Sequence, residues 1–231
     1  MSPYVKIRDS IIQDSEERGA AMPLVRSRER VRSQAEVYTR NEEINAMLDL
    51  MEDVSYNIDS RFLEPACGNG NFLVRILERK LSRICGDVDL SFSQRKKKKL
   101  SQKNFEFSAI RAVSSIYGVD ILPSNVEEAH ERMRVAIRDR YSDQLNTKKP
   151  TEGFWASVDY ILARNVIHGD MLNGNEFIEF TEFTSPKVYK IRQQVYWLED
   201  LLRGEVMGAK ARPKPVEETP MKNYWELGSD V

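Results

Sequence analysis

Apolar residues recur every three or four positions in several segments of the chain, which is the spacing of an amphipathic helix. The spacing predicts one helix over residues 42–51, with Asn41 as its N-cap, and another over 69–81. A short apolar strand is expected between them, at 61–66. A strand, a glycine-containing turn and a helix in this order begin an α/β unit.

The same kind of pattern resumes after a polar, lysine-rich segment at about 86–104. Helix spacing and apolar runs predict helices at 107–115, 124–141 and 188–202 and strands at 115–121 and 176–181, with the end of a helix and a further strand at 160–168. The helix at 124–141 starts just after Pro123, which suits a first helical position. Helices that alternate with short strands predict a mainly parallel sheet that binds ligands at the carboxyl ends of its strands.

The composition fits one soluble globular domain. The chain has 231 residues, of which 41% are hydrophobic, and 35 basic against 36 acidic side chains leave a formal charge of -1. This balance argues against a protein that binds nucleic acid through overall basicity, so such binding would need local patches. No apolar run approaches the roughly 20 residues that cross a bilayer. We therefore expect no membrane partner.

The cysteine and histidine content argues against a metal site. Cys67 and Cys85 cannot form a disulfide framework or a four-cysteine zinc site, and the two histidines lie far apart in the sequence. Two cysteines without such a framework favour a reducing compartment, and the cytoplasm is the expected location.

Charge and proline content divide the chain into three parts. Residues 1–30 are expected to form a basic N-terminal arm and residues 31–203 the folded domain, with the lysine-rich insertion at about 86–104. The run at 95–99 (RKKKK) is either a solvated loop or a contact for phosphates. Residues 204–231 contain several prolines and no apolar periodicity, so we expect a flexible tail.

The most informative segment is the run FLEPACGNGNFL at 62–73. Two glycines between strand and helix let a ligand approach the backbone, and Glu64 at the strand end can meet a cation. A dinucleotide fingerprint would need a third glycine where Leu73 stands, and no Gly-Lys-Ser/Thr triplet follows. Nicotinamide cofactors and ATP are therefore disfavoured, and a small cationic nucleoside fits better.

Acidic residues at later strand ends supply further ligand contacts. Asp87 and Asp89 compete with Asp120 for the carboxylate that holds a ribose hydroxyl pair, and we favour Asp120 because a clear helix start follows it. Asp170, in the run HGDM, could accept a hydrogen bond from an adenine amino group. Met171 or Leu172 would pack on the adenine ring.

Taken together, these segments resemble the motifs of the adenine-N6 DNA methyltransferases of restriction-modification systems, including small stand-alone and phage-borne members. Residues 64–73 resemble the cofactor motif of that family, residues 118–121 and 169–170 its next two motifs, and residues 35–39 the segment that precedes them. The resemblance implies a Rossmann-like S-adenosylmethionine-dependent methyltransferase fold of the α/β class. It implies these cofactor-binding residues: Tyr38, Thr39, Glu64, Ala66, Gly68, Gly70, Phe72, Asp120, Ile121, Asp170 and Met171.

The catalytic motif of that family, Asn/Asp-Pro-Pro-aromatic, is absent, because no proline in the chain is followed by another. Methyl transfer to adenine needs acceptors for the amine hydrogens and an aromatic surface for the flipped base. Glu182 and Phe183 follow the strand where the motif would lie and are the candidate substitutes. The alternative is an edge strand with one core aromatic residue. Only 46 residues follow from Pro186 onward, so a truncated sheet is expected.

Three functions remain open from the sequence. The favoured one is an S-adenosylmethionine-dependent DNA adenine methyltransferase, in which DNA is a partner and the catalytic site is unusual or incomplete. The main alternative is a non-catalytic cofactor-binding or interaction module that acts with or against a DNA modification system. A third is methylation of protein or RNA. A partner subunit or a second copy could bind through apolar residues of the predicted helix at 188–202.

Overall fold

The computed structural model describes residues 39–87, 100–146, 149–173, 178–201 and 213–229. The chain divides into two compact units, Met1–Arg40 and Asn41–Val231, and every helix and strand named here belongs to the second. The predicted basic arm at 1–30, residue Tyr38, and residues 88–99 of the lysine-rich insertion lie outside the described residues.

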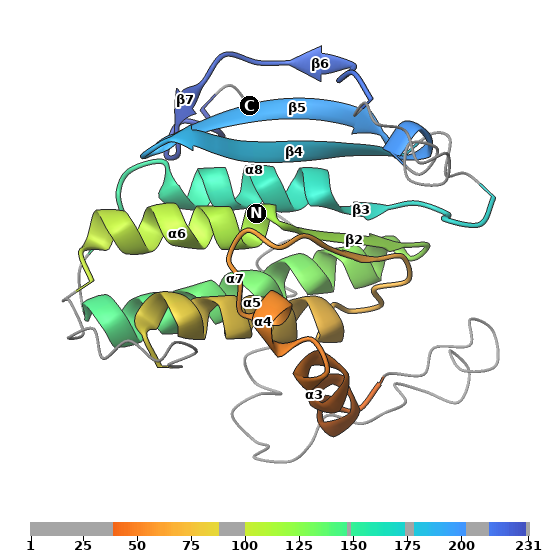
Figure 1. The fold of residues 1–231 in the computed structure, drawn as a ribbon, viewed down its shortest axis with the longest axis horizontal. Coiled ribbons are helices and arrows are strands. Elements are labelled where there is room, and N and C mark those ends of the chain that lie inside the picture. The colour runs from red at the N-terminus through yellow and green to blue at the C-terminus, as the bar shows by residue number, and fades with distance from the viewer. Residues whose placement is uncertain (1–38, 88–99, 147–148, 174–177, 202–212, 230–231) are drawn as a thin grey trace, which may run out of the picture. The chain divides into compact units, whose positions relative to one another are not determined.

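The second unit mixes helices and strands along its length (Figure 1). Its helices are α3 (Asn41–Asp49), α4 (Glu52–Ser55), α5 (Asn71–Cys85), α6 (Gln102–Ser114), α7 (Pro123–Leu145) and α8 (Phe154–Asn165). Its strands are β1 (Phe62–Glu64), β2 (Ile116–Asp120), β3 (Val166–His168), β4 (Glu179–Lys187), β5 (Lys190–Trp197), β6 (Glu217–Glu218) and β7 (Lys222–Asn223).

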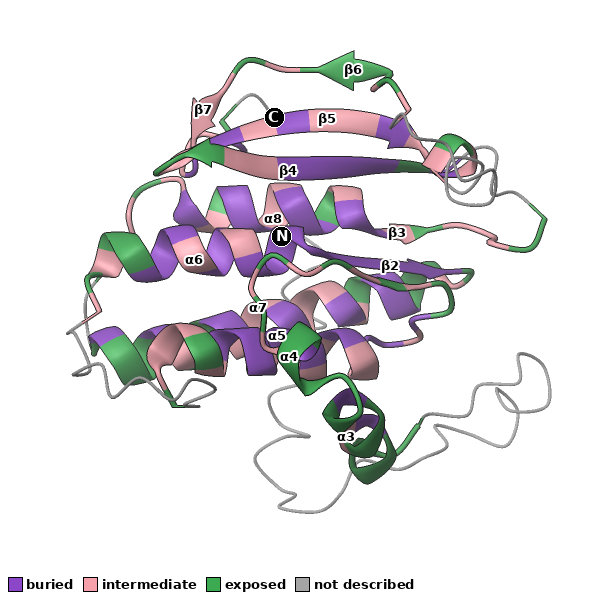
Figure 2. Ribbon diagram, viewed as in Figure 1, coloured by how far each residue is buried: buried purple, intermediate pink, exposed green. Residues whose placement is uncertain are grey.

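Three of the strands form the parallel sheet that the sequence predicts, in the order β1-β2-β3. Phe62 pairs with Ile116, and Asp120 at the end of β2 pairs with His168 at the end of β3. The predicted α/β class is therefore confirmed at this level, as a mixed α/β fold with one parallel sheet. The central strand β2 is buried along its whole length (Figure 2).

Alternate residues of β2 serve two different neighbours. Gly118 faces helix α5, because a Cβ built on it would lie 2.7 Å from Leu73 and 3.1 Å from the Cys67 sulfur. On the other face, Tyr117 and Val119 pack with apolar residues of the β4 segment. Helices α5 and α7 pack against β2 on one side, while α6 and α8 contact both β2 and β4, and the β4–β5 hairpin lies over α6 and α8 (Figure 1).

Local sequence signals account for the helix ends. Helix α5 ends at Gly86, whose left-handed conformation lets its N–H bond to Arg83 O. Helix α6 begins after Ser101, whose hydroxyl accepts from the Asn104 N–H. Helix α7 begins with Pro123 at its first position, as predicted, and runs beyond the expected end at Tyr141 to Leu145.

The prediction of a last helix at 188–202 is wrong for residues 188–197, and of its described residues only 198–201 are helical. Residues Lys190–Trp197 form strand β5, which pairs antiparallel with β4 through a turn at Val188 and Tyr189. Tyr189 adopts a positive φ of 63° there, in a turn that contains no glycine to mark it. Its ring packs against Phe107 and Tyr224, contacts that help to hold the turn.

Most apolar residues of the supposed helix are therefore partly or fully buried, although Val188 in the turn is 72% exposed. Tyr196 and Leu198 are buried in the core, Trp197 and Leu201 are half-buried, and Leu202 lies outside the described residues. The structure gives no support to a partner surface on a C-terminal helix.

The C-terminal segment also differs from the flexible tail predicted at 204–231. Among its described residues, 213–229, strands β6 and β7 pair with β5, and Tyr224 and Leu227 are buried. The Tyr224 hydroxyl donates a 2.7 Å hydrogen bond to the buried carboxylate of Glu106 on α6. The sequence pattern did not predict this structure, because single large side chains anchor the segment and no continuous apolar face marks it.

None of the helices in the described ranges combines the length and apolar character that crossing a membrane requires.

Candidate functional site

The candidate site lies at the carboxyl edge of the parallel sheet, where β1, β2 and β3 end. Glu64 at the end of β1 pairs with Gly118, two residues before Asp120 at the end of β2. The chain after β1 then runs beside β2, since the Cys67 N–H donates to Val119 O at 2.9 Å. Loops that follow parallel strands at one edge are the usual place for a ligand in such sheets.

The turn between β1 and α5 depends on its two glycines. Gly68 and Gly70 have positive φ angles of 53° and 82°, which favour glycine. A Cβ on Gly70 would lie 2.8 Å from the Ala129 side chain of α7. Gly70 is therefore required by helix packing, whether or not a ligand binds near it.

Asp120 fastens this glycine turn to the end of β2. Its Oδ2 accepts the Gly68 N–H at 2.8 Å, and its Oδ1 accepts from the Leu122 N–H at 2.9 Å and the Asn125 side-chain amide at 3.1 Å. The residue is 9% exposed. A carboxylate can accept about four hydrogen bonds, so Oδ2 retains capacity for another donor.

The structure decides between the two second-strand candidates. Asp120 ends strand β2, as predicted, whereas Asp87 follows helix α5 and binds Arg140 of α7 at 2.8 Å. Asp89 lies outside the described residues. Asp120 is thus the only one of the three candidates that the described chain brings to this edge of the sheet.

The loop after β3 approaches the same edge but uses its acid locally. The Gly169 N–H donates to Asp120 O at 3.0 Å, and a ring nitrogen of His168 lies 3.1 Å from Ile121 O. Hydrogen bonds from the Asn173 side chain and from the backbone of Leu172 and Asn173 lower the pKa of Asp170. Asp170 therefore accepts hydrogen bonds within its own turn. An adenine amino group would have to compete with these donors for the Asp170 oxygens.

Several predicted residues offer apolar surface near the turn. Ile121 is 61% exposed although it follows directly on Asp120, and Leu172 is 91% exposed. Phe72 and Met171 are half-buried and pack against the core, and Ala66 is exposed at the surface of the turn. Ile121 is the residue best placed to cover a flat apolar ring beside Asp120.

The electrostatic environment of the turn favours a positive ligand. Burial, together with the negative charges of Asp120 and Glu64, raises the pKa of Cys67 to about 12. The thiol therefore stays neutral near pH 7 and is not a nucleophile. Burial also raises the pKa of Glu64, opposed by the Ala66 N–H, which lies 3.5 Å from its Oε1.

Sequence reasoning missed the residues of α7 that support the turn. The Asn69 amide donates to Glu128 at 2.9 Å, and Arg132 donates to the Asn69 carbonyl at 2.8 Å. Asn125 completes the set through its bond to Asp120. The spacing of 125, 128, 129 and 132 along one helix face is a signal that could have found them. Thr39 belongs to the other compact unit, Met1–Arg40.

The proposed catalytic pair, Glu182 and Phe183, does not lie at this edge. Strand β4 belongs to the antiparallel sheet and not to the parallel one. The buried Glu182 forms an ion pair with Arg61, which precedes β1, at the end of the strand opposite to Glu64. Phe183 is buried and makes an edge contact with Tyr160 of α8, their ring centroids 6.4 Å apart. The geometry fits the alternative of a structural strand with a core aromatic residue.

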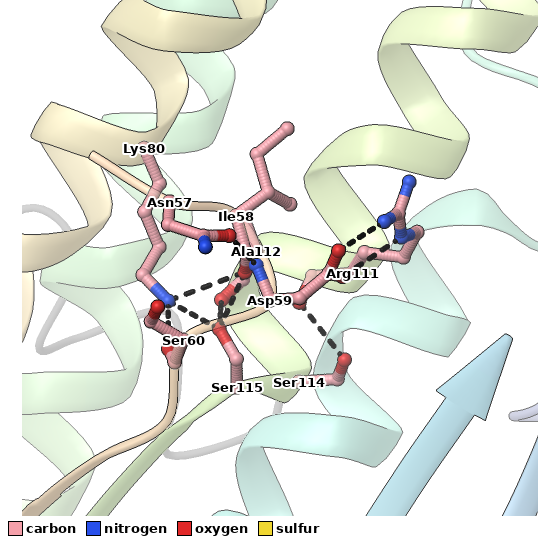
Figure 3. Close-up of polar contacts among 9 residues, drawn as sticks. All are labelled: Asn57, Ile58, Asp59, Ser60, Lys80, Arg111, Ala112, Ser114 and Ser115. Atoms are coloured by element: carbon pink, nitrogen blue, oxygen red, sulfur yellow. Dashed lines mark hydrogen bonds and ion pairs between the residues drawn. The ribbon is translucent and has the colours of Figure 1, made fainter. Parts of the chain in front are cut away.

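A second polar cluster lies at the amino ends of β1 and β2 (Figure 3). The side chain of Lys80 on α5 is fully buried, and its ammonium group donates to Ser60 O at 2.5 Å, to Ser115 Oγ at 2.5 Å and to Ile58 O at 3.2 Å. Burial lowers the pKa of Lys80 to about 7, against an opposing effect of Asp59. Because the lysine and Ser115 are both enclosed, this cluster joins α5 to the strands and offers no access to a substrate.

No group of three histidine, cysteine or acidic side chains in the described ranges is arranged to hold a metal ion. No protein-family model matches the chain, and no curated protein or solved structure matches it significantly.

Proposed function

We propose that residues 41–231 bind S-adenosylmethionine at the carboxyl edge of the parallel sheet, in a Rossmann-like arrangement similar to that of adenine-N6 DNA methyltransferases. The observation that carries the proposal is the bond from the Gly68 N–H to Asp120, which joins the glycine turn to the second strand end. When bound, this cofactor supplies an electrophilic methyl group on a sulfonium centre.

The residues present at the edge fit such a cofactor in three respects. The carboxylates of Glu64 and Asp120 make the turn negative, as their effect on Cys67 indicates, which suits a sulfonium cation. Asp120 keeps acceptor capacity for a ribose hydroxyl. The exposed Ile121 offers an apolar surface to an adenine ring beside that ribose. Asp170 fits less well, because its oxygens serve its own turn.

Two functions of this cofactor site remain. In the first, the protein transfers the methyl group to adenine in DNA with residues other than Glu182 and Phe183. In the second, it binds the cofactor without catalysis and acts with or against a DNA modification system. The burial of Glu182 beside Arg61 and of Phe183 beside Tyr160 favours the second, because neither side chain is free to meet a flipped base.

Calorimetry with S-adenosylmethionine and with its demethylated product tests the cofactor site. We expect binding that Asp120→Ala weakens by about 1–3 kcal/mol, because a charge-assisted ribose hydrogen bond is lost and the turn loosens. Asp87→Ala is the matched control and should bind like the wild-type protein, since Asp87 pairs with Arg140 away from the turn. Absence of binding at millimolar cofactor by folded protein would falsify the proposal.

A labelled-methyl assay on unmethylated DNA separates the two functions once binding is established. Transfer of label by the wild-type protein supports the methyltransferase, and binding without transfer supports the non-catalytic module. The assay should include Glu182→Gln. An equal rate in a well-folded variant removes Glu182 from the chemistry, whereas loss of transfer with unchanged cofactor affinity and melting temperature would restore it.

A further inference from the structure

A separate cavity of about 380 Å³ lies between the C-terminal part of α7 and the start of α8. Among the described residues that line it, Arg134, Arg138 and Lys149 are basic and none is acidic. The aromatic residues Tyr141 and Trp155 complete the larger part of the wall. Cavities of about 300–1,000 Å³ are the size of small-molecule sites.

The cavity is distinct from the candidate cofactor edge. The residues of α7 that support the glycine turn run from Asn125 to Arg132, whereas those of the cavity run from Arg134 to Asn146. At 1.5 Å per residue, Tyr141 lies about 24 Å along the helix from Asn125. A ligand in this cavity would therefore not overlap one held by Asp120.

Arg134 is held in a fixed orientation. Its Nη1 donates to both carboxylate oxygens of Asp159 at 2.6 Å, and its guanidinium carbon lies 5.3 Å from the centre of the Trp155 ring. These contacts neutralise much of its charge and fix the direction of its remaining N–H groups. A guanidinium fixed in this way is well suited to bind a phosphate group.

The other two cations keep their charge available. Arg138 lies 3.9 Å from its neighbour Asp139, a loose and exposed pair of little strength. Lys149 is exposed and forms no ion pair with any described residue. The positive end of α8 and the negative end of α7 both adjoin the cavity, and these dipoles offset each other. Arg138 and Lys149 are therefore the two lining cations, among the described residues, that have no close carboxylate partner.

We propose that this cavity binds a phosphate monoester, such as a mononucleotide or the terminal phosphate of a nucleic-acid strand. A phosphate group carries about -1.5 to -2 charges near pH 7, which suits the two cations Arg138 and Lys149. The aromatic wall gives the organic part of the ester an apolar contact. The proposal does not depend on the cofactor site.

Calorimetry of the full chain with AMP, adenosine and a 5′-phosphorylated oligonucleotide tests this assignment. We expect AMP or the oligonucleotide to bind below millimolar concentration, and their relative affinity identifies the source of the phosphate. Adenosine should bind far more weakly. Adenosine that binds as tightly as AMP, or no binding of either phosphate ester, overturns the proposal.

Variants localise the binding. Arg138→Gln and Lys149→Gln should each raise the dissociation constant about tenfold, and the double variant should raise it more. Both positions are exposed, so the fold should be retained. Arg83→Gln removes an exposed cation of α5 and should change the constant by roughly twofold or less. An equal loss in Arg83→Gln, or a comparable loss in Asp120→Asn, would place the binding elsewhere and reject the assignment.

Discussion

Two buried charged side chains, Asp120 and Lys80, lie at opposite ends of the strand pair β1 and β2. Asp120 accepts three hydrogen bonds at the carboxyl end, and Lys80 donates three at the amino end. Each satisfies backbone groups of a loop that would otherwise lack partners, which makes both residues part of the structural frame of the sheet.

The lowered pKa of Lys80 leads us to expect that the free energy of unfolding rises with pH. Its pKa is about 7 in the folded protein and close to the ordinary 10.5 when unfolded. Between these values the unfolded chain binds more protons, so the free energy of unfolding increases as the pH rises above 7. We expect a contribution of about 1–2 kcal/mol between pH 7 and about 8.5, measured by urea unfolding.

The variant Lys80→Met should remove that contribution, whatever its effect on stability at pH 7. The pH range ends at about 8.5 so that the two cysteines do not contribute. Burial raises the pKa of Cys67 and of Cys85 above the ordinary 9.0. The unfolded chain therefore releases these protons first, and the free energy of unfolding falls as the pH rises above 9. Lys187→Met, at an exposed position, is the control and should keep the wild-type slope. An unchanged slope in Lys80→Met would show that Lys80 is not the group responsible.

At the scale of elements, the β4–β5 hairpin is the feature that most separates this fold from the expectation of one truncated parallel sheet. The hairpin packs over α6 and α8, and its first strand also contacts β2, where the Tyr117 hydroxyl donates to Thr181 O at 3.3 Å. It therefore covers the sheet face that α5 and α7 leave open, and its residues are structural.

Truncation of Phe183 tests this assignment. Phe183→Ala should lower the free energy of unfolding by about 3–5 kcal/mol, because a buried aromatic ring is replaced by a cavity beside Tyr160. Val188→Ala, at a 72% exposed position in the same hairpin, should change it by roughly 0.5 kcal/mol or less. Equal, small effects of both changes in chemical denaturation would contradict the core position of Phe183.

At the scale of the whole molecule, Glu106 joins four parts of the chain. Its carboxylate accepts from Gln102 on its own helix, from Tyr141 on α7, from the Thr151 N–H and from Tyr224 near the C-terminus. Burial alone would raise the pKa of Glu106, but the hydrogen bonds from Thr151, Tyr224 and Gln102 lower it below its ordinary value. Its contribution to stability is thus present above about pH 4.5 and is lost as the pH falls through the lowered pKa.

The link to the C-terminal segment predicts a specific cost for Tyr224→Phe. Removal of the hydroxyl should lower the free energy of unfolding by about 1–3 kcal/mol, because a buried, charge-assisted hydrogen bond is lost while the ring is kept. Tyr189→Phe removes an exposed hydroxyl that donates to Asn104 and should cost less. Thermal melting of the two variants measures the difference, and equal melting temperatures would contradict the role of this bond.

Local sequence signals specify the α/β units and the acid that ends the second strand. Strand, glycine turn and helix at 62–85 and the helix start at Pro123 are local signals, carried by φ preferences and apolar spacing within one segment. They placed Asp120 and the glycine turn at one edge, because parallel strands that precede helices share their carboxyl ends.

Tertiary packing selected the structure of residues 178–201 and 213–229. The segment 188–202 has both helix-like apolar spacing and the valine, tyrosine and tryptophan content of a strand, and pairing with β4 selected the strand. That pairing placed Glu182 beside Arg61 and enclosed Phe183, so the candidate catalytic pair became core. The buried partners of Lys80 and Glu106 were also hidden from the sequence, because hydrogen bonds between distant segments depend on the packing that brings those segments together.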